Sequence, residues 1–257
     1  MAFPQLVIEL LQDDVKFKIF QQKMFLHYTN LYFFLSIHNF IMVSYSNITL
    51  RKPLLIIMTK WPGYGRCKTR LAIDIGENNA LRIHNSMFWH TLAVAKYLEN
   101  NDVLEISLAI SGIGLNKSKR WCDNLGIRSF NLQGSGSLGE RMKRQLLINN
   151  RKKQRHTIII GTDLPDLCHL NLIQGIKMLD SRDVILGPSD DGGYWLIGFS
   201  DRMLSSKNFY PFININWSSN NVIQETINNL SAQKINIDFL PLRIDIDTIS
   251  DIRKRSR

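Results

Sequence analysis

The chain has 257 residues, a formal net charge of +10, 44% hydrophobic residues and 21% charged residues. These values are typical of an ordinary globular protein, and the length suits one large α/β domain with a core that needs no disulfides. The three cysteines, Cys67, Cys122 and Cys168, lack the spacing of a metal site, so we predict a protein of the reducing cytoplasm.

The positive charge gathers in two clusters, at residues 151–155 and 253–257. Such clusters attract nucleic acid, anionic lipid or phosphorylated small molecules. No aromatic residues alternate with these charges and no nucleic-acid-binding motif is present in the sequence. We therefore interpret the clusters as a solvated loop and a frayed basic tail, and we expect no nucleic-acid partner.

Residues 1–50 differ in composition from the rest and are treated as an N-terminal extension. Their longest apolar run, Leu31–Leu35, is far shorter than the roughly 20 residues that a membrane span needs, so no transmembrane segment is expected. Acidic residues precede the first lysine, unlike the basic start of a signal peptide. Three interpretations stay open: a poorly ordered or mis-assigned extension with translation starting at Met42, an accessory helix packed on the domain, or a helix on a membrane surface.

From Pro53 onward, apolar runs of strand length alternate with segments of helical periodicity. In chain order we expect strand 54–58, helix 77–99, strand 103–110, helices 117–125 and 138–149, strand 157–160, helix 169–179, strands 184–186 and 194–199, helix 221–230, and strand 235–241. Repeated strand–helix–strand units imply a mostly parallel sheet covered on both faces. The sequence thus predicts a single three-layer α/β/α domain over residues 51–252, followed by the basic tail 253–257.

The loop after the first strand carries Lys60, Arg66, Lys68 and Arg70 among several glycines. Lysine offers a point charge and arginine a planar fork for phosphate oxygens, while glycine lets a ligand approach the backbone closely. The loop lacks the Gly-Lys-Ser/Thr ending of a Walker loop and the third glycine of a dinucleotide fingerprint. It is interpreted as a phosphate-binding loop, with a solvated surface turn as the alternative.

Asp163 lies two positions after the strand 157–160, behind a glycine turn and before Pro165. Ligands of open α/β sheets bind outside the carboxyl ends of the strands, and Mg²⁺ takes one or two protein carboxylates together with substrate phosphates. Asp163 is therefore the first candidate for a catalytic, metal-holding residue, and its alternative is a turn aspartate bonded to its own backbone. Asp166 is expected to cap the helix that begins near His169.

Two further segments carry paired acids. In the loop Gly187–Trp195, Asp191 and the amides of Gly192 and Gly193 are candidates to face a substrate, although Asp-Gly is also a strong hairpin signal. After the last strand, Asp245 and Asp247 point the same way if the chain is extended, and Thr248 is expected to cap a terminal helix. A second carboxylate for the cation can come from this pair.

The remaining polar candidates are interpreted as structural. Glu140 and Arg141 open a predicted helix, where the helix dipole favours a carboxylate. His84, His90 and His156 lie in predicted helices or at a strand start.

Together and in this order, these segments resemble the bacterial glycosyltransferase-like family with a GT-A fold that is related to molybdenum cofactor guanylyltransferase and 2-phospholactate guanylyltransferase. The matching pieces are Met58–Lys60, Lys68–Leu71, Leu138–Met142, Gly161–Leu167, Gly187–Tyr194, Trp217–Ser218 and Asp245–Thr248. One departure is Ser219, where the family more often has threonine. The resemblance implies a nucleotide-diphospho-sugar transferase (GT-A) fold that binds a nucleotide and Mg²⁺ or Mn²⁺.

By the same resemblance, Lys68 and Arg70, with Lys60 beside them, bind the nucleotide phosphates. Asp163 and Asp247 hold the metal, Asp163 and Asp191 are the catalytic candidates, and the substrate-binding residues that face the acceptor are Gly192, Gly193 and Tyr194. The expected enzyme is a metal-dependent transferase, glycosyltransferase-like, that acts on a nucleotide or nucleotide-sugar and has a small-molecule acceptor as its other partner. Two alternatives stay open: a nucleotidyltransferase that releases pyrophosphate, and a catalytically inactive nucleotide-binding protein.

Overall fold

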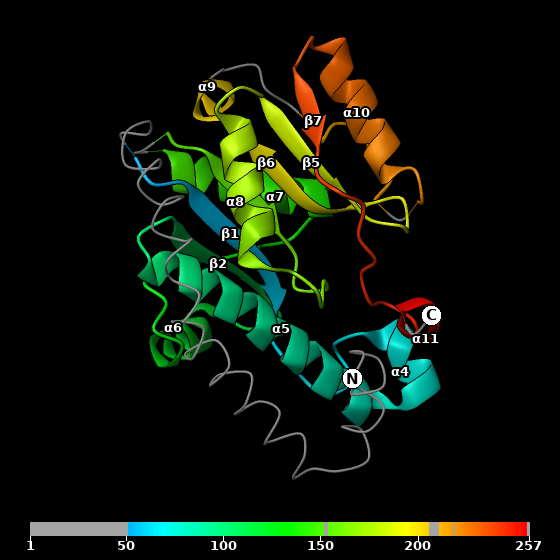
Figure 1. The fold of residues 1–257 in the computed structure, drawn as a ribbon. Helices are drawn as coiled ribbons and strands as arrows, with labels where there is room; N and C mark the ends of the chain where they lie inside the picture. The colour runs from blue at the N-terminus through cyan, green and yellow to red at the C-terminus, as the bar shows by residue number, and fades with distance from the viewer. Residues whose placement is uncertain (1–50, 152–153, 206–210, 218, 256–257) are drawn as a thin grey trace, which may run out of the picture.

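The computed structural model describes residues 51–151, 154–205, 211–217 and 219–255 (Figure 1). The predicted N-terminal extension, Met42 and Ser218 therefore lie outside the described residues. Within the described ranges, no helix is both long and apolar enough to cross a membrane.

The core of the molecule is a seven-stranded sheet with the strand order β3-β2-β1-β4-β6-β5-β7. Every neighbouring pair is parallel except the two that involve β6, which runs antiparallel to β4 and to β5. The strands are β1 (Leu54–Lys60), β2 (Glu105–Ser111), β3 (Ser129–Leu132), β4 (Thr157–Ile160), β5 (Val184–Pro188), β6 (Tyr194–Phe199) and β7 (Ile237–Phe239).

Helices cover both faces of this sheet, which gives the three predicted layers (Figure 1). One apolar cluster joins the sheet to α5 (Glu77–Asn100), α6 (Leu115–Asn124) and α8 (His169–Leu179). A second cluster, on the other face, joins it to α7 (Leu138–Asn150) and α10 (Val222–Ala232). The other described helices are α4 (Thr69–Ile75), α9 (Asp201–Leu204) and α11 (Ile249–Arg255).

The central strands explain why the apolar runs in the sequence are continuous. All four residues of β4 are buried, and Ile159 pairs with Ile56 of β1 on one side and with Ile197 of β6 on the other. A strand with both faces covered has no solvent face to alternate with, so it reads as an uninterrupted β-branched run. This burial fixes the point at which the chain emerges at Gly161.

The predicted α/β architecture is confirmed, and each predicted strand and helix is present in the structure. The bounds of α8 and β6 agree with prediction, and β2 begins two residues later than expected. The structure adds β3, α4 and α9, and it shows that residues 253–255 continue α11. Lys254 of this segment lies 2.7 Å from an oxygen of Asp190, so part of the basic tail is tied to the domain.

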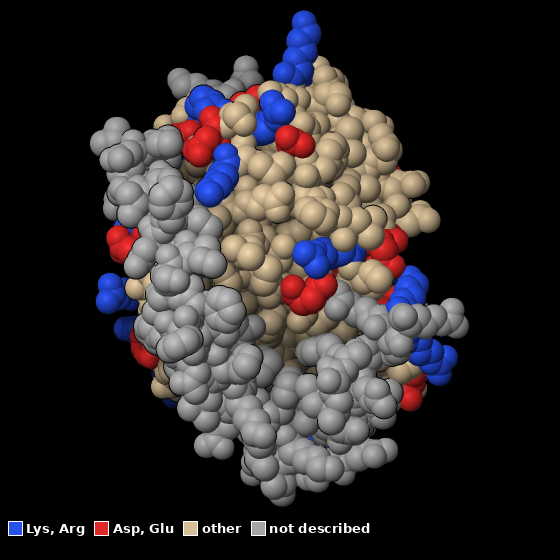
Figure 2. Space-filling view, in the orientation of Figure 1, with Lys and Arg blue, Asp and Glu red and all other residues tan. Residues whose placement is uncertain are grey.

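Charged side chains of opposite sign lie side by side on the face of the molecule shown in Figure 2. On the described part of the face shown in Figure 2, lysine and arginine side chains stand in small groups beside aspartate and glutamate. Pairs such as Arg243–Asp166 and Lys254–Asp190 account for part of this mixing. Alternating signs weaken the long-range field that a net positive charge would otherwise produce.

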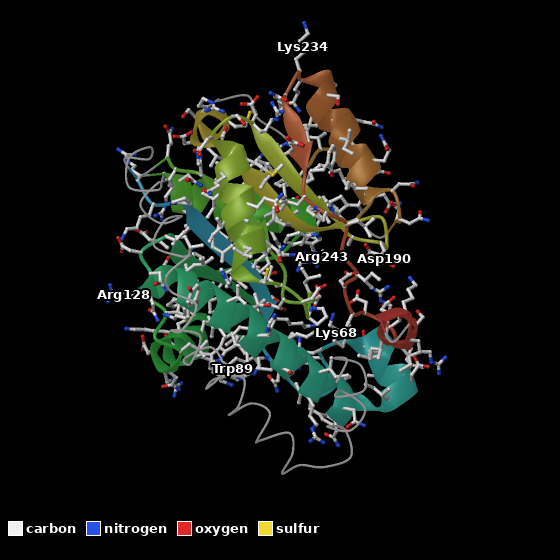
Figure 3. All side chains as sticks on the ribbon, in the orientation of Figure 1. Lys68, Trp89, Arg128, Asp190, Lys234 and Arg243 are labelled. Atoms are coloured by element: carbon white, nitrogen blue, oxygen red, sulfur yellow. The ribbon has the colours of Figure 1, made fainter. Side chains whose placement is uncertain are left out.

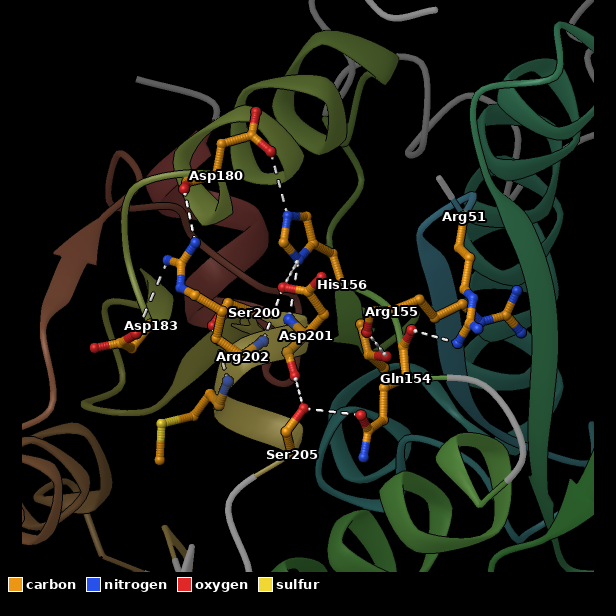
Figure 4. A network of polar contacts seen from close by, with 12 residues as sticks. Arg51, Gln154, Arg155, His156, Asp180, Asp183, Ser200, Asp201, Arg202 and Ser205 are labelled. Carbon is orange, nitrogen blue, oxygen red and sulfur yellow. Dashed lines mark hydrogen bonds and ion pairs between the residues drawn. The ribbon is translucent and has the colours of Figure 1, made fainter. Parts of the chain in front are cut away.

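A network of polar contacts around His156 lies at the end of the sheet opposite to Asp163 (Figure 4). His156 precedes β4 and is 5% exposed. Its Nδ1 accepts a hydrogen bond from the backbone N–H of Asp201 at 3.0 Å, so the proton of the neutral ring sits on Nε2, 3.2 Å from Oδ1 of Asp180. The ring therefore ties β4 to the end of α8 and the start of α9, as its structural interpretation requires.

Replacing His156 with alanine should destabilise the fold by about 2–4 kcal/mol, because a buried ring and both of its hydrogen bonds are lost. Urea denaturation monitored by circular dichroism measures this loss. Asp180→Asn keeps an acceptor at the same place and should cost much less. A His156→Ala protein as stable as wild type would show that the network contributes nothing to stability.

Candidate functional site

A cavity of about 470 Å³ lies outside the carboxyl ends of β1 and β4. Its walls come from the loop after β1, the turn after β4, the start of α7 and the segment after β7. Five basic side chains and two carboxylates line it: Lys60, Arg66, Lys68, Arg70, Arg141, Asp163 and Asp247. The cavity thus contains all five residues predicted to bind phosphate or metal.

Lys68 stands at the centre of the charged part of this cavity. Its Nζ lies 2.7 Å from Oδ1 of Asp163 and 2.6 Å from Oδ1 of Asp247, and the side chain is only 5% exposed (Figure 3). The residue has the left-handed backbone conformation, with φ 49° and ψ 47°, immediately before α4. This conformation is uncommon outside glycine, asparagine and aspartate, and such residues gather at functional sites.

The C-terminal segment brings Asp247 to this lysine from far along the chain. The backbone N–H of Ile246 donates a hydrogen bond to the carbonyl of Asp163 at 3.0 Å, which fixes the two carboxylates side by side. Ile246 and Ile252 then pack with Leu71 of α4 and residues of α5 in a separate apolar cluster. Figure 1 shows α11 beside α4 as a result of this packing.

Thr248 directly precedes α11, at the predicted cap position, but its hydroxyl acts as a donor to the first turn, whereas a capping side chain accepts from a backbone N–H. Its backbone N–H and its hydroxyl both donate to Oδ2 of Asp251, at 2.7 and 2.8 Å. The backbone N–H of Asp247 donates to the same oxygen at 3.1 Å. The Asp251 carboxylate therefore also holds the backbone of the predicted metal ligand, Asp247.

The carboxylates of the site strongly influence one another. Burial would raise the pKa of Asp247, but the attraction of Lys68 and then of Arg70 lowers it below its usual value. Burial would lower the pKa of Lys68, but Asp163 and Asp247 raise it. Asp245 shifts in the opposite direction to Asp247: burial first, and then Asp191, Asp247 and Asp163, raises its pKa to about 7. The carboxylates around Lys68 therefore carry more negative charge than this one lysine neutralises.

Gly161 is not required by the geometry of the turn that carries Asp163. Its φ does not fall in the left-handed region, and a Cβ at this position would have no atom within 4 Å. The turn is held instead by the contact of the Asp163 carbonyl with Ile246. The expectation that a glycine turn positions Asp163 is thus wrong in its cause, although the position is as expected.

The predicted acceptor-facing loop is only partly in the cavity. Among the described residues, Tyr194 lines the cavity, whereas Asp191, Gly192 and Gly193 do not. Oδ1 of Asp191 accepts hydrogen bonds within its own loop, from the hydroxyl of Ser189 at 2.6 Å and from the N–H of Gly193 at 2.9 Å. The roles of Asp191 and the two glycines in substrate binding stay predictions.

Gly192 has a demonstrable packing role. Its φ is +87°, and a Cβ there would lie 1.8 Å from the carbonyl oxygen of Asn220. Its own carbonyl accepts a hydrogen bond from Ile223 at 2.9 Å, at the start of α10. Only glycine allows the two backbones to approach this closely.

Sequence reasoning missed three contributors to the cavity. His84, which was interpreted as structural, lines the cavity together with Cys67. Arg141 also lines it, while its Nε donates to the carbonyl of Gly136 at 3.0 Å. The sequence signal at Arg141 was its place at a helix start, where Ser137 and Glu140 form a capping box. His84 gives no such signal, because its helical periodicity is that of any core-facing residue.

One helix cap was predicted wrongly. Cys168, not Asp166, is the residue before α8, and its backbone N–H donates to Oδ1 of Asn171 at 2.9 Å. Asp166 instead accepts a hydrogen bond from Nη1 of Arg243 at 3.0 Å, and Arg243 is labelled in Figure 3. An ion pair with a distant segment has replaced the local cap.

The fold and the cavity define a nucleotide-diphospho-sugar transferase type of architecture. A solved structure from Desulfovibrio desulfuricans G20, provisionally described as a nucleotide-diphospho-sugar transferase, is similar with 25% identity and a TM-score of 0.70. That match covers 78% of this chain and 84% of the other. The resemblance to a GT-A-like family is thereby confirmed.

Residues 94–219 match the family described as "Uncharacterized protein conserved in bacteria", DUF2064. No curated protein matches the chain.

Two more distant structures share the fold only in outline. One is 4-diphosphocytidyl-2C-methyl-D-erythritol synthase from Anaerococcus prevotii DSM 20548, with 13% identity, a TM-score of 0.48 and coverage of 80% of this chain and 96% of the other. The other is inositol-1-phosphate CTP transferase from T. maritima, with 10% identity, a TM-score of 0.47 and coverage of 80% and 95%. At these distances they carry no argument about activity.

Proposed function

We propose that this protein is a glycosyltransferase-like enzyme that uses a metal-bound nucleotide or nucleotide-sugar and a small-molecule acceptor. The observation that carries the proposal is that the carboxylates of Asp163 and Asp247 both contact the ammonium of Lys68. They do so in a cavity whose other charged groups are basic. The similarity to a structure described as a nucleotide-diphospho-sugar transferase supports the same substrate class.

The basic side chains that line the cavity suit the phosphates of a nucleotide. The five basic side chains come from β1, the loop after it, α4 and α7, and all line the same cavity: Lys60, Arg66, Lys68, Arg70 and Arg141. Phosphoryl and glycosyl transfers from nucleotides place negative charge on phosphate oxygens, and fixed cations stabilise that charge as it develops. Lys68 and Arg70 are already oriented, because each is paired with Asp247.

The two carboxylates fit a divalent cation, although the described residues contain no group of three or more His, Cys, Asp and Glu side chains that could hold a metal. Mg²⁺ commonly takes one or two protein carboxylates and completes its shell with substrate phosphates and water. Asp163 and Asp247 would hold it, and the ion would neutralise charge on the phosphates. The Lys68 ammonium stands between these carboxylates, and a point that attracts one cation is suited to another.

A nucleotidyltransferase is the second candidate. Five basic side chains around one cavity suit the high charge of a nucleoside triphosphate, which would lose pyrophosphate to a phosphorylated or acidic acceptor. The two candidates differ in their products and not in the residues that they need.

Isothermal titration of a panel of nucleotides and nucleotide-sugars, with and without Mg²⁺, tests the proposal. Binding should require Mg²⁺, and Asp163→Ala should weaken it at least about tenfold, a loss of about 1.4 kcal/mol. Asp166→Ala is a matched control. It removes another carboxylate from the turn that carries Asp163, one that is paired with Arg243.

Release of pyrophosphate would then identify nucleotidyl transfer, and release of a nucleoside diphosphate would identify glycosyl transfer. If no nucleotide binds, or if Asp163→Ala binds as tightly as wild type, the proposed function is wrong.

A further inference from the structure

One buried polar side chain in the wall of the cavity has no part in the proposed function. Gln133 directly follows β3, is 5% exposed and lines the cavity together with Lys68 and Arg141. A buried amide needs hydrogen-bond partners for both its nitrogen and its oxygen, because each bond left unmade costs free energy. The partners of Gln133 therefore indicate what its side chain does.

The nitrogen of this amide is bonded to two strands of the sheet. Nε2 of Gln133 donates hydrogen bonds to the carbonyl oxygens of Thr59 in β1, at 3.0 Å, and of Ala109 in β2, at 2.9 Å. Carbonyl oxygens only accept, so the nitrogen is the atom that faces them. The backbone N–H of Gln133 also donates to the carbonyl of Ile110 at 2.8 Å. The amide thus has one orientation, which leaves Oε1 for another partner.

The oxygen of the amide contacts Arg141. Oε1 of Gln133 accepts a hydrogen bond from Nη1 of Arg141 at 3.4 Å, and the carbonyl of Gly136 accepts one from Nε of the same guanidinium at 3.0 Å. Two acceptors at different nitrogens fix both the position and the plane of this group. Of the five N–H groups of a guanidinium, these contacts use two, and the other three remain for a ligand in the cavity that Arg141 lines.

The segment that carries both acceptors is itself held in place. Gly136 has a φ of +104°, a conformation that favours glycine. Arg144 of α7 donates hydrogen bonds to the carbonyl of Gln133 and, at 3.0 Å, to that of Ser135. Both acceptors are therefore fixed by the protein itself.

Arg141 differs from two of the other basic side chains of the cavity in what it contacts. Lys68 and Arg70 are paired with carboxylates, which offset their charge. The two oxygens that hold Arg141 belong to a side-chain amide and to a peptide group, which are uncharged. These contacts therefore fix the guanidinium without offsetting its charge. A cation oriented in this way stabilises an anion without having to reorganise when the anion binds.

We propose that Gln133 is a positioning residue, which holds the guanidinium of Arg141 toward the cavity so that it binds a phosphate group of the substrate. The bonds of the Gln133 nitrogen to β1 and β2, and the bond of its oxygen to Arg141, carry this inference. It rests on the proposed function for the nature of the ligand. The orientation of Arg141 is a property of the protein alone and can be measured without a nucleotide.

The first measurement is the rate at which the guanidinium of Arg141 turns about its Nε–Cζ bond, obtained by NMR exchange spectroscopy of full-length protein labelled with nitrogen-15 arginine. In the wild type this rotation should be at least about tenfold slower than that of the exposed Arg128, because the bond to Oε1 of Gln133 must break first. Gln133→Met removes the acceptor and should speed the rotation of Arg141 by a similar factor. The spectrum of Arg141→Lys assigns the signal.

The second measurement is the affinity for inorganic pyrophosphate with Mg²⁺, by isothermal titration, since nucleotide-diphospho-sugars and nucleoside triphosphates both contain a diphosphate. Gln133→Met should weaken binding at least about fivefold, and Arg141→Met at least about tenfold. The double variant should bind no more weakly than Arg141→Met, because a residue that acts through Arg141 has no further effect once Arg141 is gone. A role confined to the packing of β1 and β2 would instead weaken binding equally in both backgrounds.

Gln145→Met is the matched control. Gln145 is a fully buried glutamine on the helix that carries Arg141, and its Nε2 donates to the carbonyl of Leu132, the residue before Gln133, at 3.0 Å. The substitution removes a buried amide from the same region and leaves the acceptor of Arg141 in place. It should change neither the rotation of Arg141 nor the affinity for pyrophosphate.

The proposal is overturned if Arg141 turns as freely as Arg128 in the wild type, a result that requires no variant to fold. It is also overturned if the wild type does not bind pyrophosphate, or if Gln133→Met weakens binding to the same degree with and without Arg141. Failure of the proposed function gives a different result. If pyrophosphate binds but no nucleotide or nucleotide-sugar does, the proposed function is wrong, and the rotation of Arg141 still decides whether Gln133 positions it.

Discussion

Replacing Lys68 with methionine should turn Asp163 and Asp247 into a cation site that works without nucleotide. In wild-type protein the ammonium lies 2.7 and 2.6 Å from the two carboxylates and competes with any divalent ion. Removal of this buried cation takes from Asp163 its ion pair with Lys68 and leaves Asp247 paired with Arg70, and breaking a buried pair costs about 3–5 kcal/mol of folding stability. A divalent ion that binds the folded form should restore part of this loss.

Titration of Mn²⁺, followed by electron paramagnetic resonance of the free ion, measures the first effect. The Lys68→Met protein should bind Mn²⁺ at least about tenfold more tightly than nucleotide-free wild type. Thermal unfolding with and without Mn²⁺ measures the second, and the variant should gain far more stability from the ion than wild type does.

Arg70→Met supplies the control for the loss of a positive charge. Arg70 contacts the same Asp247, but its side chain is 68% exposed, so solvent replaces its charge at little cost. If wild type and Lys68→Met bind Mn²⁺ equally well without nucleotide, Lys68 does not compete for the site. The proposal of nucleotide binding would survive that result, because it rests on the titration of nucleotides.

Gly192→Ala should destabilise the protein by about 3 kcal/mol or more. The new methyl group would meet the carbonyl oxygen of Asn220 at 1.8 Å, and the φ of +87° is unfavourable for any residue with a Cβ. The clash is with backbone, so no side-chain rotation relieves it. Guanidinium denaturation should show the loss of stability.

Gly161→Ala is the matched control for this glycine. It lies in the turn before Asp163, its φ is not in the left-handed region, and nothing lies within 4 Å of the position that the new methyl group would take. It should change stability by less than about 0.5 kcal/mol. Equal effects of the two substitutions would contradict the assignment of a packing role to Gly192 alone.

The parts of the fold with strong local patterns could be predicted from the sequence. The helix His169–Leu179 and the strand Tyr194–Phe199 have the expected bounds because their apolar residues follow one period to the end. Strand β3, Ser129–Leu132, has only four half-buried residues, too few for a pattern. Helix α4 begins at Thr69, directly after Lys68, and nothing in the sequence indicates the left-handed conformation of that lysine.

The site was predictable where topology alone brings residues together. Loops after neighbouring strands meet at one edge of a sheet, and β1 and β4 are neighbours, so topology alone accounts for the nearness of Lys68 and Asp163. The pairing of Lys68 with Asp247, 179 positions apart, depends on the exact packing of α4, α5 and the C-terminal segment. Such contacts leave no periodic signal in either partner.

The attachment of Asp247 also determines when during synthesis the site can exist. Lys68 and Asp247 are separated by 179 positions, and the latter is held by Ile246 and by packing that includes Ile252. A nascent chain still short of these residues can form the sheet, yet it presents Asp163 and Lys68 as an isolated pair. Completion of the charged centre therefore coincides with the emergence of α11 from the ribosome, and a chain that is still being made lacks the second carboxylate that the proposed function requires.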